Sequence, residues 1–116
     1  MGWPNMKARN ALLAAVPYPV EQSLRKLGAN LKAARLRRNQ TASDVAQKIG
    51  TSRFVVADAE KGKPSTNIAV YAALLWAYGL IDQLTAVADP SQDDEGTALS
   101  LTRERARCSR KLNNDF

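Results

Sequence analysis

Apolar residues recur along the chain at the spacing of amphipathic α-helices. From Val20 they occupy positions i, i+4, i+7 and i+11, which is the pattern of one buried helix face. Shorter apolar runs follow, each separated from the next by a glycine, a proline or a polar turn. The pattern predicts an all-α fold with five helices, at about residues 20–38, 41–49, 51–61, 67–78 and 80–89.

The sequence on either side of these helices has a different character. Residues 1–19 are predicted to form an N-terminal arm, in which a short helix ends at the "PYP" stretch because proline disfavours helix at the residue before it. Residues 20–90 are predicted to form the folded domain. Residues 91–116 are predicted to be a linker and a basic C-terminal tail, in which Leu99 and Leu101 alternate with polar residues and are a candidate strand.

Local signals mark the helix ends in the middle of the chain. Thr41 and Asp44 have the spacing of a capping box, in which each side chain binds the backbone amide of the other residue. Gly50 is expected to end this helix, since glycine adopts a positive φ without steric cost. Thr51 or Ser52 is expected to cap the next helix.

The composition argues against enzyme chemistry. The 116-residue chain contains no histidine, so the commonest general base and the commonest metal ligand are both missing. Its single cysteine, Cys108, cannot form an intrachain disulfide and suits a reducing cytoplasm. It has neither a glycine-rich phosphate loop nor paired acidic residues in a predicted pocket. We therefore expect no enzyme activity, no catalytic residue, no metal site and no cofactor.

Two observations argue against a membrane protein. The longest apolar run, residues 68–81, has 14 residues, which is fewer than the roughly 18 that span a bilayer. The N-terminus also lacks the pattern of a secretory signal. We expect a cytoplasmic protein with no membrane partner.

Charge is distributed unevenly along the chain, whose net charge is +6. Residues 24–63 carry ten Lys or Arg and three acidic residues, whereas residues 64–96 carry five acidic residues and no Lys or Arg. Residues 97–116 are basic again, with a net charge of +3. A basic region next to an acidic one suits a polyanion bound on one side, and a solvated charged surface is the alternative.

The basic region contains the residue spacing of a helix-turn-helix. Such a motif needs a small residue where its two helices touch, a residue that tolerates a positive φ at the turn, and apolar anchors on the second helix. Ala46, Gly50, Val56 and Ala59 stand at these positions. Side chains that face outward on the second helix would lie in a DNA major groove. These outward residues are Arg53, Phe54, Ala57 and Asp58.

The outward residues have different chemistry toward bases. Arg53 is suited to the O6/N7 edge of guanine, and a phosphate-only or exposed role is the alternative. Phe54 either contacts a thymine methyl group or covers a neighbouring helix, and Asp58 either accepts from a cytosine amino group or has a structural role. Phosphates are expected at helix N-termini and at flanking basic side chains, although each lysine is alternatively a solvated surface residue. The predicted phosphate contacts are Arg38, Thr41, Thr51, Ser52, Lys61 and Lys63.

Three stretches carry a resemblance to a known family: "LGANLKAARLRR", "TASDVAQKIGTSRFVVADAEKG" and "NIAVYAALLWAYGL". They resemble the phage-repressor type of helix-turn-helix domain, the XRE family. The resemblance covers about residues 24–90 and implies a five-helix, lambda-repressor-like DNA-binding domain. It also implies a structural ion pair between Arg35 and Glu60.

The apolar half of this domain is expected to pack in the core or against a second copy of the chain. Two copies related by a twofold axis would place their recognition helices about 34 Å apart, one turn of DNA, on a palindromic operator. The residues expected in the core or the homodimer contact are Tyr71, Leu75, Trp76, Leu80 and Leu84.

A second, narrower likeness concerns the end of the chain. The segment "VADPSQDDEG" and the Arg-rich tail are similar to those of HipB-like antitoxins. Proteins of that type repress their own operon and bind HipA-like serine/threonine kinase toxins. The likeness implies an autoregulating antitoxin that is associated with the bacterial nucleoid when it is bound to DNA.

Two alternatives stay open. One is a general phage-type repressor without a toxin. The other is a protein-interaction adaptor that has lost DNA binding. The adaptor is favoured by the acidic Asp58 on the outward face and by Ala42, at a position where relatives often have glutamine.

Overall fold

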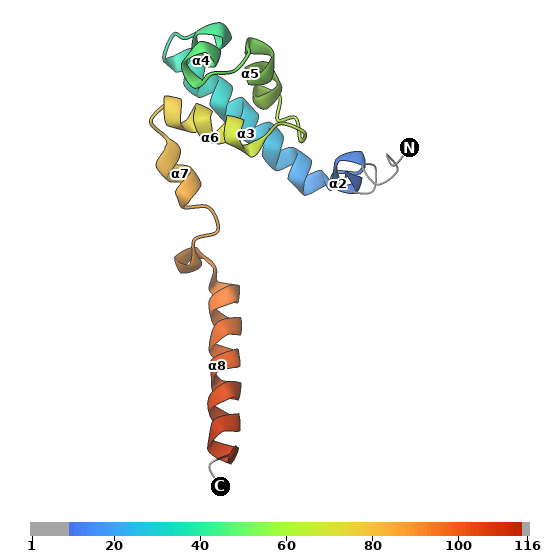
Figure 1. Ribbon diagram of the computed structural model, residues 1–116, viewed down its shortest axis with the longest axis vertical. Coiled ribbons are helices and arrows are strands. Elements are labelled where there is room, and N and C mark those ends of the chain that lie inside the picture. Colours follow the sequence, from blue (N-terminus) through green and yellow to red (C-terminus); the bar gives the residue numbers. More distant parts are fainter. Residues whose placement is uncertain (1–9, 115–116) are drawn as a thin grey trace. The chain divides into compact units, whose positions relative to one another are not determined.

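The computed structural model describes residues 10–114, with side chains described up to residue 110. All regular elements in this part of the chain are helices, which confirms the predicted all-α class (Figure 1). The chain divides into two units, Met1–Leu84 and Thr85–Phe116. Residues 1–9 of the predicted arm and residues 115–116 of the predicted tail lie outside the described residues.

The first unit contains a helical domain in which α4 and α5 pack against each other, α3 packs against α5, and α6 packs against both α4 and α5 (Figure 1). Helices α3 to α7 occupy the five stretches of sequence in which helices were predicted. The helices of this unit are α2 (Ala11–Ala14), α3 (Tyr18–Arg37), α4 (Ala42–Ile49), α5 (Arg53–Glu60), α6 (Ile68–Ala77) and α7 (Ile81–Thr85).

One hydrophobic core lies between these helices. Helices α3 and α5 each contribute two side chains three positions apart, as amphipathic helices do, and α4 contributes two adjacent ones. The side chains of Val56 and Ala59, which anchor α5, are completely buried. The buried core residues are Leu31, Ala34, Val45, Ala46, Val56, Ala59, Tyr71, Leu74, Leu75 and Tyr78.

The predicted helix-end signals at the start of α4 and at the α4–α5 corner are confirmed. The Thr41 amide donates to the Asp44 carboxylate and the Asp44 amide donates to the Thr41 hydroxyl, both at 3.0 Å. Gly50 ends α4 with a φ of 83°. The Thr51 amide donates to the Ala46 carbonyl at 2.9 Å, which closes the turn.

Helix α3 begins two residues earlier than predicted. Its first residue is Tyr18, with Pro17 at the N-cap and Pro19 in the first turn. Proline is compatible with these positions because the first amides of a helix have no acceptor within the helix. The "PYP" stretch therefore both separates α2 from α3 and starts α3.

Helix α7 is shorter than the predicted 80–89 segment. It ends at Thr85, and Ala88 then adopts a left-handed conformation with a φ of 59°. A short 3-10 helix, η1 (Pro90–Gln92), follows, and the Asp89 side chain caps it by accepting from the Ser91 amide at 2.8 Å.

The second unit contains α8 (Asp94–Asn114), so the candidate strand at Leu99 and Leu101 is wrong. Alternation over so few residues does not outweigh the helix signals around it. The Asp93 carboxylate accepts from the Gly96 amide at 2.9 Å at the start of the helix, where Asp94 also favours the positive end of the helix dipole. The described residues include no helix with the length and apolar character needed to cross a bilayer.

Candidate nucleic-acid interface

The second helix of the corner, α5, rests on α3 through close contact between backbones. Gly28 is buried in the middle of α3, and a Cβ atom there would lie 2.5 Å from the Glu60 carbonyl oxygen and 2.7 Å from the Ala59 carbonyl oxygen. Gly62 follows α5 with a φ of 70°, and a Cβ atom there would collide with the Leu24 carbonyl group. Neither close contact was predicted from the sequence. The signal at position 28 was a glycine inside a helical pattern, and Gly62 was predicted only to belong to a loop.

An ion pair fixes the other end of this contact. The Arg35 Nε and Nη2 atoms donate to the two carboxylate oxygens of Glu60 at 2.7 and 3.0 Å. The Arg35 side chain is 12% exposed and that of Glu60 is 7% exposed. Arg35 Nη1 also donates to the Gln40 carbonyl at 3.0 Å, so one guanidinium joins α5 to the end of α3 and to the following turn.

The hydrogen bonds from Arg35 to Glu60 raise the pKa of this arginine above its usual value, since they stabilise its charged form. The Arg35 guanidinium therefore stays charged at physiological pH. The ion pair holds α5 in one orientation relative to α3, with its outward face directed away from the core.

That outward face presents an arginine and an aromatic ring to solvent. Arg53 and Phe54 occupy the first turn of α5, and the Phe54 side chain is 67% exposed. The guanidinium carbon of Arg53 lies 5.0 Å from the centroid of the Phe54 ring, in a cation–π contact. Ala57 is half-buried on the next turn.

Asp58 is half-buried, and its carboxylate Oδ2 lies 3.7 Å from the Lys63 Nζ atom. This distance and the exposure of both side chains make the ion pair a weak one. The pair still places a positive charge beside the only acidic side chain of the outward face.

The predicted phosphate contacts at helix N-termini lie at the starts of α4 and α5. Thr41 caps α4 and Ser52 caps α5, where its hydroxyl oxygen accepts from the Val55 amide at 3.3 Å. A hydroxyl that accepts in this way keeps its own hydrogen available for a phosphate oxygen. Thr51 is half-buried between the two helices.

Arg38 is placed differently from the other predicted phosphate contacts. Its Nη1 atom donates to the Ala34 carbonyl at 2.8 Å and its Nη2 atom donates to the Tyr78 carbonyl at 2.9 Å. Its guanidinium carbon also lies 5.4 Å from the centroid of the Tyr78 ring. Arg38 thus caps the end of α6, and its contact with phosphate stays a prediction.

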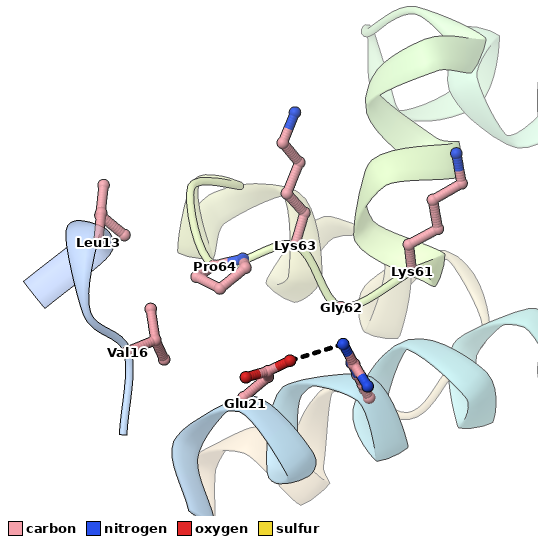
Figure 2. Close-up of a pocket in the computed structure, with 8 residues that line it drawn as sticks. Leu13, Val16, Glu21, Lys61, Gly62, Lys63 and Pro64 are labelled. Atoms are coloured by element: carbon pink, nitrogen blue, oxygen red, sulfur yellow. Dashed lines mark ion pairs between the residues drawn. The ribbon is translucent and has the colours of Figure 1, made fainter. Parts of the chain in front are cut away.

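Lys61 and Lys63 flank the turn at Gly62, and both are exposed. Their side chains extend from this turn away from α3, above a groove of about 420 Å³ (Figure 2). The Tyr71 hydroxyl donates to the Lys63 carbonyl at 3.1 Å, so the core holds the turn in place. The residues that line the groove are Leu13, Val16, Glu21, Arg25, Lys61, Gly62, Lys63 and Pro64.

A polar loop beside α5 is a further candidate that sequence analysis treated only as a connection. Ser65, Thr66 and Asn67 line a hollow of about 350 Å³ together with Thr51 and Asp58. The Asn67 side chain caps α6 by accepting from the Ala69 amide at 2.8 Å. The signal in the sequence was a run of three polar residues directly before an apolar helix, which is the pattern of a helix N-terminus.

The residues predicted for the core or the dimer contact fall into two groups. Tyr71 and Leu75 are buried in the core, and Leu80 and Leu84 pack against it partly buried. Trp76, in contrast, is 58% exposed. A dimer contact by Trp76 stays a prediction.

Among the residues that the structure describes, no group of acidic or cysteine side chains could hold a metal ion.

A family model described as "Helix-turn-helix domain" matches residues 26–88. This range begins inside α3 and includes the corner, the ion pair and α6. The chain has no significant match among curated proteins or among solved structures.

Proposed function

This chain belongs to the helix-turn-helix domain family, whose domain binds DNA, and we propose that it is a sequence-specific repressor that acts on a palindromic operator at the bacterial nucleoid. The observation that carries the proposal is the exposure of Arg53 and Phe54 on a helix whose opposite face is held by backbone contact and an ion pair. Base reading needs such free side chains on a rigid element. We further propose the five-helix arrangement of phage repressors for α3 to α7.

The charges around α5 support this proposal. Arg53, Lys61 and Lys63 are exposed cations on α5 and on the turn that follows it. The hydroxyl groups of Thr41 and Ser52 add donors at two helix N-termini, which favour anions. In this arrangement the lysines and hydroxyl groups fix the domain on the phosphate backbone while α5 contacts the bases.

The composition of α6 supports a homodimer. This helix consists entirely of apolar residues and tyrosine, and helices that are apolar on all sides are normally covered on all sides. Ile68 and Trp76 are 67% and 58% exposed, however. A second copy of the chain would cover them and would supply the second recognition helix for the other half of a palindrome.

We also propose that the repressor is a HipB-like antitoxin that binds a HipA-like kinase. The support is the likeness of the "VADPSQDDEG" segment, together with α8, whose described side chains from residue 97 to residue 110 are all exposed and include four arginines. A kinase encoded next to this gene that co-purifies with the full chain would support the partner. A neighbouring gene of another type leaves a general repressor.

The DNA-binding proposal is tested with the DNA upstream of the protein's own gene, in the presence of competitor DNA and at two salt concentrations. Arg53→Ala should weaken operator binding by about 1–3 kcal/mol and leave binding to random DNA nearly unchanged. Lys61→Ala is the matched control, because it should weaken both DNAs alike and reduce the salt slope by about one.

An equal loss on both DNAs for Arg53→Ala would contradict base reading by this residue. The absence of any saturable, competitor-resistant complex would instead favour the adaptor alternative. Sedimentation of the wild type and of Trp76→Ala tests the dimer, since the variant should dissociate at a higher protein concentration than the wild type.

A further inference from the structure

The contact between Arg53 and Phe54 sets these two residues apart from the rest of the outward face. The guanidinium lies over the ring, 5.0 Å from its centroid, so the two side chains form a cation–π contact. The ring itself is 67% exposed, so it is not buried against a neighbouring helix. A large aromatic side chain is thus kept in solvent directly beside the candidate base-reading arginine.

If the two side chains keep this contact on DNA, the contact determines where the ring lies. An arginine that binds the O6 and N7 atoms of guanine places its flat guanidinium close to the plane of that base. A ring stacked on this guanidinium then lies above or below that plane. Because neighbouring base pairs are separated by about 3.4 Å, the ring reaches the level of the adjoining base pair.

The major groove offers an apolar ring few partners at that level. Base edges there carry hydrogen-bond donors and acceptors, and the thymine 5-methyl group is the apolar exception. Ala57, which follows Arg53 by one turn, carries only a methyl group and so leaves the space beside the ring open.

We propose that α5 reads a two-base-pair unit, in which Arg53 binds guanine and Phe54 contacts the methyl group of a thymine in the adjoining base pair. This inference rests on the proposed DNA-binding function and adds the sequence class that the site recognises. It also makes 5-methylcytosine an acceptable substitute for the thymine, since both bases carry the same methyl group.

The test begins with selection of tightly bound duplexes from a random-sequence library by the full chain. Each thymine of the selected sequence is then replaced singly by deoxyuridine, which removes the methyl group and nothing else. Replacing the thymine next to the Arg53-dependent guanine should weaken wild-type binding about fourfold, the ratio that corresponds to burial of one methyl group. A duplex with 5-methylcytosine at this position, in a C·G pair, has the methyl group restored. It should bind more tightly than the same duplex with unmodified cytosine.

The matched variants are Phe54→Ala and Arg53→Ala, both at exposed positions. Phe54→Ala should bind the thymine and deoxyuridine duplexes equally while keeping the preference for guanine, and far-ultraviolet circular dichroism verifies that it folds. A selected sequence with no thymine beside that guanine overturns the inference. A deoxyuridine effect that persists in Phe54→Ala also overturns it. Both results leave the repressor proposal standing. If no sequence is enriched, both proposals fail.

Discussion

Removing the charge of Glu60 should destabilise the domain far more than removing that of an exposed acidic residue. Glu60 is 7% exposed at its side chain and accepts two hydrogen bonds from Arg35. Loss of one partner of a buried ion pair costs about 3–5 kcal/mol, because the other charge stays buried without compensation. Glu60→Gln keeps an amide oxygen as acceptor, so we expect about 3 kcal/mol.

Thermal and urea unfolding followed by circular dichroism measure this loss. For a domain of this size, about 1 kcal/mol corresponds to a shift in Tm of about 4–8 °C, so Glu60→Gln should lower Tm by roughly 12–24 °C. The control is Glu21→Gln, which removes an ion pair with Arg25 of comparable length, 2.6 Å. The side chains of that pair are 36% and 61% exposed, so its loss should cost less than about 0.5 kcal/mol.

Equal effects of the two substitutions would refute this reasoning, since they would mean that burial adds nothing to the Arg35–Glu60 pair. The double variant Arg35→Met with Glu60→Leu removes both charges together. It should recover most of the stability lost in Glu60→Gln, because hydrophobic replacements of similar volume are well tolerated at buried ion pairs. The Gln40 carbonyl, which loses its donor in this variant, accounts for the remainder.

Substitutions at three further positions test other parts of the domain. Gly28→Ala should lower the free energy of unfolding by about 1–3 kcal/mol in urea titrations, because the added Cβ would meet backbone atoms that cannot rotate away. Alanine is the better helix former, so a gain in stability would contradict the close contact. Gly50→Ala should cost about 1–2 kcal/mol from its φ of 83° alone, since no atom lies within 4 Å of the added Cβ, and Gly50→Asn should cost less. The hydrogen bond from the Thr41 amide holds the pKa of Asp44 below its usual value of 3.8. The ionised carboxylate therefore contributes stability that is fully present above about pH 4. This stability is lost as the pH falls through the lower pKa of the folded state. Asp44→Asn should therefore lose less stability than the wild type between pH 5 and about pH 2 in the same titrations, and equal losses would exclude this carboxylate as a cause.

Features that depend on a few neighbouring residues were predictable from the sequence. The capping box at Thr41 and the left-handed turn at Gly50 follow from local backbone chemistry, so residue type and spacing are enough to place them. The same holds for the burial of Val56 and Ala59, because helical periodicity identifies the inner face of α5.

Features that depend on distant neighbours were not predictable in the same way. Gly28 needs to be a glycine only because α5 approaches it closely, and nothing near it in the sequence indicates that approach. Arg38 was assigned to phosphate from its charge, whereas its hydrogen bond to the Tyr78 carbonyl depends on where α6 ends. The candidate strand in α8 failed because alternation over a few residues does not distinguish a strand from a helix in an exposed segment.

The backbone contact at Gly28 and Gly62 has a consequence for how such a protein can diverge. The contact between α3 and α5 at these two glycines consists of main-chain atoms, so it does not depend on which side chains stand at positions 53, 54 and 57. If α5 contacts DNA bases as proposed, descendants of this gene can acquire new target sequences by substitution on one face of a single helix, with little penalty in folding. The two glycines themselves cannot accept a Cβ atom without a clash with main-chain atoms.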